Sequence, residues 1–133
     1  MDGTPSSIGT ESGPFQDGLA RRAIVVQECL GCQRRRLPRL PACPYCARTE
    51  AVDVAAEGGG VVYSWVRVHR PLGEAPTVAS GEVPYVVAAV DLDGGARVFA
   101  RLEPAAAAAV GLAVVPKFVE HDGWTELRFR PAS

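Results

Sequence analysis

The four cysteines of this 133-residue chain form two Cys-x-x-Cys pairs, Cys29–Cys32 and Cys43–Cys46, and this spacing constrains the fold more than any other feature. Each pair can fold as a tight knuckle that aims two sulfur atoms at one point, and Gly31 and Pro44 suit the turns. Two knuckles together offer a tetrahedral cage for Zn²⁺ at Zn–S distances of about 2.3 Å. We therefore expect a ribbon with one structural Zn²⁺ per chain, because four protein ligands leave no position for a metal-bound water.

Two other uses of the cysteines stay open from the residues alone. An iron site of the rubredoxin type would use the same four sulfur ligands. A pair of disulfides would need an oxidising compartment.

The segment Met1–Ser7 has neither a basic nor an apolar region, so we see no export signal and expect a cytoplasmic location. No apolar run approaches the roughly 18 residues of a membrane-spanning helix, so we expect no membrane association.

The charge is unevenly distributed along the chain, although the formal net charge is only −1. Residues 21–49 contain seven arginines and a single acid, Glu28, which gives +6 with neutral thiols and leaves −7 for the remainder. Part of this positive charge balances the formal −2 of a zinc tetrathiolate. The excess can attract an anionic ligand or an acidic partner face, or it can simply be a solvated surface.

The chain divides into four predicted segments. Residues 1–14 are rich in Gly, Ser, Thr and Pro and predict a disordered tail. Residues 15–24 predict a short docking helix, because Phe15 and Leu19 recur at helical spacing and a helix this short must pack on something. The zinc ribbon is expected at 25–50, and a small barrel at 51–131.

The barrel segment shows the period-two pattern of β-strands. The clearest strand is 61–69, where one face is expected to carry Tyr63, Trp65, Arg67 and His69 and the other Val62, Ser64, Val66 and Val68. A helix is expected at 103–111, with proline in its first turn and Gly111 past its end. Further strands are expected at 51–57, 85–92, 96–102, 112–120 and 125–130.

The order of strands after the glycine run 58–60 is three strands, a helix and two strands. This is the order of an OB-fold, a small Greek-key barrel. The absence of βαβ spacing argues against a doubly wound sheet. The predicted fold class is therefore mainly β: a rubredoxin-like zinc ribbon followed by an OB-fold Greek-key barrel, with a short N-terminal helix.

The layout resembles a bacterial and archaeal family of acyl-CoA-associated zinc-ribbon/OB-fold proteins, also known as domain of unknown function 35. The resemblance covers roughly residues 15–131, and the matching stretches are 29–32, 37–46, 60–66, 69–71, 84–88 and 128–131. It implies a non-catalytic accessory or scaffold subunit of an acyl-CoA-processing complex. The implied partners are a larger thiolase-like enzyme, a lipid-transfer-type aldolase or an enoyl-CoA hydratase, and the implied role is to help bind acyl-CoA or shape its tunnel.

The residues themselves give no sign of autonomous catalysis. The candidate groups match no nucleophile or acid–base arrangement; they are His69, His121, Asp91, Asp93, Glu82 and Tyr85. We therefore expect the chain not to be an enzyme on its own.

The predicted face with Tyr63 and Trp65 has three interpretations: ordinary core, a protein interface or acyl-CoA channel, or a stacking platform for single-stranded nucleic acid. The last is the alternative function, and the acidic balance of the barrel argues against it. If acyl-CoA binds this chain, we expect its phosphates near Arg34, Arg35 and Arg36 or near Arg70, at the junction of ribbon and barrel, because arginine gives bidentate phosphate contacts.

Overall fold

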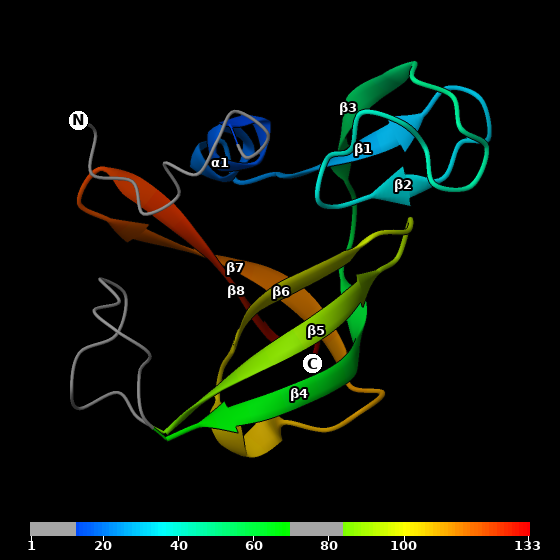
Figure 1. Ribbon diagram of the computed structural model, residues 1–133. Helices are drawn as coiled ribbons and strands as arrows, with labels where there is room; N and C mark the ends of the chain where they lie inside the picture. The colour runs from blue at the N-terminus through cyan, green and yellow to red at the C-terminus, as the bar shows by residue number, and fades with distance from the viewer. Residues whose placement is uncertain (1–12, 70–83) are drawn as a thin grey trace.

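A zinc ribbon and a closed barrel lie next to each other in the computed structural model, which describes residues 13–69 and 84–133 (Figure 1). No helix in these two ranges is long and apolar enough to cross a membrane. The elements are α1 (Gly13–Ala20), β1 (Ile24–Cys29), β2 (Arg35–Arg36), β3 (Ala51–Ala56), β4 (Gly60–Val68), β5 (Tyr85–Leu92), β6 (Arg97–Leu102), the 3₁₀ turn η3 (Ala105–Ala107), β7 (Ala113–His121) and β8 (Trp124–Pro131).

The ribbon is an antiparallel sheet with the strand order β2-β1-β3. β3 pairs with β1 along its whole length, from Ile24 opposite Ala56 to Cys29 opposite Ala51. The segment Ala51–Ala56, which the sequence analysis placed in the barrel, is therefore part of the ribbon sheet. A short alternating strand fits either sheet equally well, so the pattern alone could not decide, and the pairing with β1 corrects the assignment.

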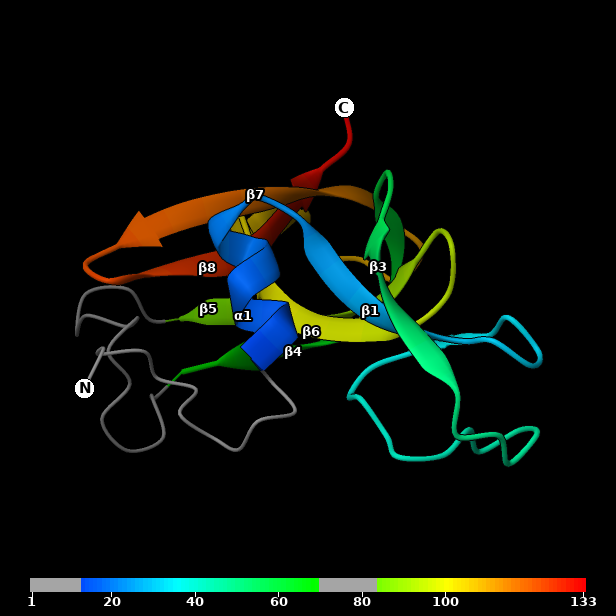
Figure 2. The ribbon, with the colours of Figure 1, turned by 90° about the horizontal axis from the view of Figure 1, so that it is seen from above.

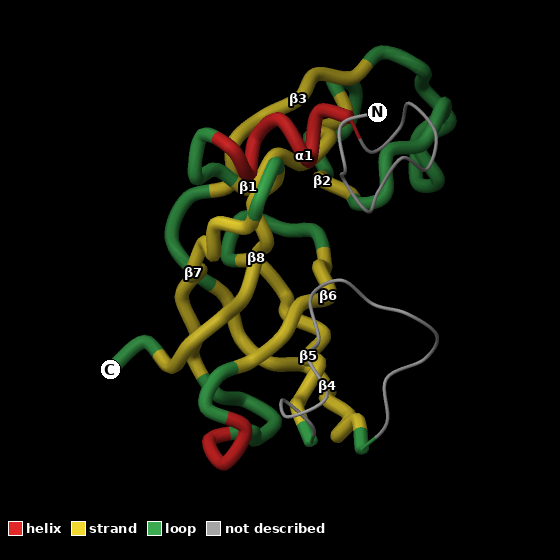
Figure 3. Tube along the Cα trace, turned by 90° about the vertical axis from the view of Figure 1, so that its left-hand side faces the viewer, coloured by secondary structure: helices red, strands yellow, loops and turns green. Residues whose placement is uncertain are grey.

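The barrel has the strand order β4-β5-β6-β8-β7 and is closed by pairing between β4 and β7. β6 and β8 run parallel, whereas the other neighbouring strands are antiparallel. This is the predicted OB-fold order, and the strands wind around a common interior (Figure 3). The glycine run 58–60 joins the two sheets, as expected: β3 ends at Ala56 and β4 begins at Gly60.

A β-bulge in β4 reverses which side chains face the interior, and it makes the predicted faces of this strand wrong. Val62 pairs with Val90 but Ser64 pairs with Ala89, so Tyr63 is an extra residue on β4. Before the bulge Val62 points inward and is 1% exposed. After it Trp65 packs against the core while Val66 is 60% exposed. A bulge shifts the alternation by one residue, so Tyr63 and Trp65 lie on opposite faces.

One hydrophobic core joins the helix, the ribbon and the barrel. Leu19 of α1 and Ile24 and Val26 of β1 belong to the same buried cluster as Val62 and Phe129 of the barrel. The predicted docking helix is therefore present, and it docks on this chain's own strands β1 and β8. Seen from above, α1 lies across one end of the barrel (Figure 2).

The boundaries of α1 differ from the prediction. The helix runs from Gly13 to Ala20 instead of 15–24, because the backbone leaves helical geometry at Arg22, whose φ is +61°. The disordered tail predicted at 1–14 lies outside the described residues except for its last two, which begin α1.

The helix predicted at 103–111 is only a 3₁₀ turn over Ala105–Ala107. None of its three residues is buried. Alanines favour a helix, but they offer little apolar surface to bury, and a helix of this length is marginal without packing. Ala105 and Ala108 still pack against the core. The 3₁₀ turn lies at the end of the barrel opposite α1 (Figure 1).

Ion pairs stabilise the contact between strands β6 and β8, which are paired at only two positions. Arg128 is 8% exposed, and its guanidinium donates to Glu103 and, at 2.8 Å, to Glu126. Lys117 Nζ donates to Glu103 at 2.9 Å. Burial raises the pKa of Glu103, but hydrogen bonds from Lys117 and Arg128 outweigh it and hold the pKa below its usual value. The carboxylate thus stays ionised and continues to bind both cations at neutral pH.

The close contact between the glycine run 58–60 and strand β7 can be tested directly by substitution. A Cβ on Gly59 would lie 2.0 Å from the backbone oxygen of Val114, an atom that cannot move aside. We expect Gly59→Ala to lower the free energy of unfolding by about 2 to 3 kcal/mol, because the barrel strand must shift. Chemical denaturation measures this. Gly13→Ala, with nothing within 4 Å of the new Cβ, is the control; equal stability of both variants would contradict the packing.

Candidate metal centre

The four cysteine sulfur atoms meet at the end of the ribbon away from α1, where all of them lie within 4.8 Å of one another. The Sγ atoms of Cys29 and Cys46 are 3.5 Å apart, and those of Cys32 and Cys43 are 3.6 Å apart. Sulfur atoms at the corners of a tetrahedron around Zn²⁺ are separated by about 3.8 Å when each Zn–S distance is about 2.3 Å. No disulfide joins the four cysteines. The four sulfur atoms thus form a compact group that can hold one metal ion, which supports a metal-binding site in the ribbon.

The two knuckles are built in the same way. In each, the N–H of the first cysteine donates to the carbonyl five residues later: Cys29 to Arg34 at 2.9 Å and Cys43 to Arg48 at 2.8 Å. The N–H four residues later donates back to the carbonyl of that cysteine. Those residues, Gln33 and Ala47, have positive φ angles of +63° and +68°. The ribbon thus holds its metal with two copies of one turn.

Gly31 plays a different part from the one expected. The left-handed residue of the first knuckle is Gln33, not Gly31. A Cβ on Gly31 would instead lie 2.4 Å from Cδ of Arg48, so the glycine leaves room for the stem of that side chain. The close approach of Arg48 is a tertiary contact between the two halves of the ribbon, which local turn preferences do not reveal.

The thiols differ in how readily they ionise. The N–H of Cys32 lowers the pKa of Cys29 to about 6, against the opposing effect of burial, and the N–H of Gly31 lowers it further. At Cys46 the N–H of Arg48 lowers the pKa, but the three neighbouring sulfur groups outweigh it and raise the pKa to about 11. Four thiolates therefore repel one another strongly unless a cation lies between them. The site is a tetrathiolate cage that needs a divalent or trivalent metal ion.

The three consecutive arginines near the metal do not act as one cluster. The Arg34 guanidinium lies 4.3 Å above the ring of Tyr45, and Arg35 is bound to Glu28 at 2.9 Å. Arg36 is buried, with 7% exposed, and donates to the carbonyl of Leu40 at 3.2 Å. Its Nε and Nη1 atoms have no hydrogen-bond partner among the described residues.

A cleft of about 440 Å³ separates the ribbon from the β5–β6 hairpin of the barrel. Three guanidinium groups and one carboxylate stand around it, so its lining is positively charged. Arg35 comes from the ribbon, while Arg97 comes from the barrel and is tied to Asp91 at 2.6 Å. The lining residues are Arg35, Arg36, Leu37, Tyr45, Asp91, Leu92, Gly95, Ala96 and Arg97.

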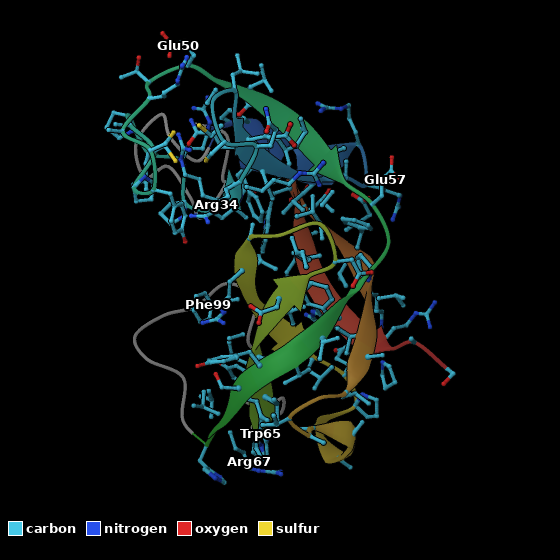
Figure 4. All side chains as sticks on the ribbon, turned by 90° about the vertical axis from the view of Figure 1, so that its right-hand side faces the viewer. Arg34, Glu50, Glu57, Trp65, Arg67 and Phe99 are labelled. Carbon is cyan, nitrogen blue, oxygen red and sulfur yellow. The ribbon has the colours of Figure 1, made fainter. Side chains whose placement is uncertain are left out.

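The other predicted binding residues are scattered. Tyr63 lies on the outer face of the barrel, 55% exposed, with the Arg97 guanidinium 3.7 Å from its ring centre. Trp65 packs inward in the C-terminal half of β4, close to Arg67 (Figure 4). Arg70 lies outside the described residues. The shared aromatic and basic face expected at Tyr63 and Trp65 is therefore absent, because of the bulge.

Two residues of the ribbon, Gln27 and Arg36, have a supporting role that was not predicted from the sequence. The buried Gln27 accepts a hydrogen bond from the N–H of Leu40 at 2.9 Å, and Arg36 donates to the Leu40 carbonyl. Together they fix the proline-containing linker between the knuckles. Gln27 falls in an otherwise apolar strand, which was the one signal that it has a special role. No comparable signal distinguished Arg36 from its neighbours.

A rubredoxin-like metal ribbon joined to an OB-fold barrel defines a recognisable class of small proteins, and comparisons with known proteins agree. A family model for the rubredoxin-like zinc ribbon domain of ChsH2 matches residues 16–53, and one for the C-terminal OB-fold domain of ChsH2 matches residues 53–119. The chain therefore belongs to the ChsH2 family of zinc-ribbon/OB-fold proteins, also known as DUF35, as the sequence indicated.

Three curated relatives are similar in sequence. A "probable enoyl-CoA hydratase alpha subunit" of Thermomonospora curvata is 34% identical over 95% of this chain and 39% of its own length. A "DUF35 domain-containing scaffold protein" of Methanocaldococcus jannaschii is 33% identical over 59% of this chain and 53% of its own length. The "3-oxo-4,17-pregnadiene-20-carboxyl-CoA hydratase alpha subunit" of Mycobacterium tuberculosis is 28% identical over 97% of this chain and 45% of its own length. The chain thus spans about half or less of these relatives.

Two solved structures share the fold. A chain of an "Ltp2-ChsH2(DUF35) aldolase" superposes with a TM-score of 0.80 at 33% identity, covering 96% of this chain and 98% of that one. A DUF35 protein of unknown function from Sulfolobus solfataricus superposes with a TM-score of 0.65 at 18% identity. The match covers 92% of this chain and 86% of that one, and it supports the fold alone.

Removing one ligand tests the structural role of the metal. We expect Cys43→Ser to lose its metal and the order of the ribbon tip, because metal ligation supplies on the order of 10 kcal/mol in small zinc modules. The barrel should persist, since its core holds Phe129, Leu102 and Val90. Metal analysis and amide hydrogen exchange measure both effects. Full protection of residues 29–50 in a metal-free variant would contradict this role.

Proposed function

We propose that the chain is a non-catalytic accessory subunit of an acyl-CoA-processing enzyme, working in the cytoplasm with one structural Zn²⁺. The observation that carries the proposal is the nearly end-to-end match to a chain of an aldolase that contains ChsH2. The two hydratase alpha subunits among the relatives support the link to acyl-CoA, since each is named as part of a hydratase of a CoA ester. Zinc is favoured over iron by the zinc-ribbon family model.

The surroundings of the candidate catalytic groups also support a non-catalytic role. His121 is bound to Glu126 at 2.8 Å and stacks on Trp124. Asp91 is held by Arg97, and Asp93 accepts the N–H of Gly59 in the glycine run 58–60. Each of these groups has a structural partner, and they do not converge on one cavity. None of these three groups is therefore positioned with another candidate acid, base or nucleophile in the way that catalysis requires.

Purification tests the accessory role. The chain expressed at native level in its host should co-elute with a larger thiolase-, aldolase- or hydratase-type enzyme, identified by mass spectrometry. The isolated chain should show no turnover of an acyl-CoA, because the candidate groups in residues 13–69 and 84–133 do not come together as a catalytic arrangement. Turnover by the isolated chain, or elution of the native chain free of any such enzyme, would overturn the proposal.

Acyl-CoA, where it contacts this chain, is proposed to place its phosphates in the cleft between ribbon and barrel. The charge of the cleft and the bidentate geometry of arginine support this location. Of the three consecutive arginines, Arg35 is the suitable probe, since Arg36 is buried and holds the Leu40 linker. The pantetheine arm and the acyl group would then extend towards the catalytic subunit.

Two matched arginines test this location. In the complex with the catalytic subunit, we expect Arg35→Ala to weaken CoA binding about 10-fold, the effect of losing one charged hydrogen bond of about 1.5 kcal/mol. Calorimetric titration with CoA measures it. Arg39→Ala is the control, because Arg39 is ion-paired to Asp53 in the same ribbon but does not line the cleft. Equal affinities in both variants would move the CoA site into the partner.

A further inference from the structure

The outer face of strands β4, β5 and β6 is unusually apolar for an exposed sheet. Nine large apolar side chains are exposed among residues 13–69 and 84–133, and four of them lie on this one face. They are Val61, Tyr63, Val66 and Phe99, with exposures between 42% and 69%. Phe99, the most exposed of the four, points away from the barrel (Figure 4). Grouped apolar exposure of this kind marks an interaction site.

The strand register arranges this face in three rows. The first row is Val61, Asp91 and Arg97; the second is Ser64, Ala89 and Phe99; the third is Val66, Val87 and Arg101. Tyr63, the extra residue of the bulge, stands beside the first row. We call this set the outer β4–β6 face. The bulge creates it, because it directs Tyr63 and Val66 to the same side as Phe99 and turns Trp65 into the barrel.

The charged groups of the outer β4–β6 face are held in place before any partner arrives. Arg97 is bound by Asp91 through two hydrogen bonds, at 2.6 and 3.2 Å, and its guanidinium lies over the ring of Tyr63. The guanidinium of Arg101 lies 4.6 Å from the ring centre of Tyr85. Fixed side chains lose little conformational entropy on binding. The aromatic residues and arginines of this face are of the types enriched in protein interfaces.

The same face of other OB-folds binds oligonucleotides, but the charge here argues against that use. The carboxylate of Asp91 lies within it and neutralises Arg97, and Val61, Val66 and Val87 cannot stack on bases. The described barrel residues 60–69 and 84–133 are also neutral overall, because they contain six basic and six acidic residues. The basic residues are Arg67, Arg97, Arg101, Lys117, Arg128 and Arg130, and the acidic residues are Asp91, Asp93, Glu103, Glu120, Asp122 and Glu126. A binder of single strands needs a broadly positive groove.

We propose that the outer β4–β6 face is the surface that docks the catalytic subunit. This rests on the proposed accessory role and specifies the face that it uses. Asp91 balances one of the two guanidinium groups, so the face is mainly apolar with a formal net charge of +1, and it is complementary to an apolar protein surface that carries a carboxylate at its rim. Phe99 and Tyr63 are the central anchors.

Charge insertion tests the docking face. In the complex with the co-purifying enzyme, Val66→Asp and Phe99→Asp should each raise the dissociation constant at least about 30-fold, the effect of losing an interface anchor worth 2 kcal/mol or more. Both side chains are mostly exposed, so the fold should survive, and unchanged metal content and circular dichroism check this. Val110→Asp is the matched control: Val110 is 71% exposed but lies between η3 and β7, off this face.

The outcomes separate this proposal from the accessory role itself. If the wild-type chain binds the enzyme and both face variants bind equally well, the docking face is wrong and the accessory role stands. If the native chain has no enzyme partner, both fail. A wild-type homodimer that Phe99→Asp dissociates without weakening enzyme binding would assign the face to self-association. Binding of a poly-dT 20-mer at low salt that Phe99→Asp abolishes would assign it to nucleic acid instead.

Discussion

Mutual repulsion among four thiolates, which a cation between them relieves, is the constraint on which the ribbon depends. β2 has only two residues and the linker after it contains two prolines, so backbone pairing alone fixes little of the segment between the knuckles. A metal ion bound by the four sulfur atoms would tie Cys29 and Cys32 to Cys43 and Cys46 and so restrict the path of the segment between them. Gln27 and Arg36 then anchor that path at Leu40. The ribbon side of the cleft, with Arg35 and Tyr45, is positioned as a result.

The barrel depends on a different principle, the burial of alternating apolar side chains in a closed sheet. β5 supplies Val86, Ala88 and Val90, all fully buried, and Phe129 fills the interior from β8. Closure leaves few free edges, so the barrel presents faces rather than edges to other molecules. The arrangement divides the surface by chemistry: a positively charged cleft next to the metal ribbon, and an apolar, aromatic face on strands β4 to β6.

The sequence predicted the strand order and the grouping of the four cysteines well, because both are encoded locally. Cysteine spacing defines a cage, and glycines at 58–60 and around the hairpin turn separate the strands. It failed where a tertiary contact decides between equal local options. The strand Ala51–Ala56 alternates as a barrel strand would, yet it pairs with β1. The bulge at Tyr63 leaves no trace in composition, and burial separates Arg36 from Arg34 and Arg35 although the three are identical in type.

The core shared by α1, β1 and the barrel makes this protein hard to divide. The two family models meet at Asp53, in the middle of a strand that is fully paired with β1. The OB-fold model ends at residue 119, before β8 delivers Phe129 to the interior. A break at either point would separate partners that bury one another. Recombination between genes would therefore preserve a working fold only by carrying helix, ribbon and barrel together, as one inherited unit despite two named domains.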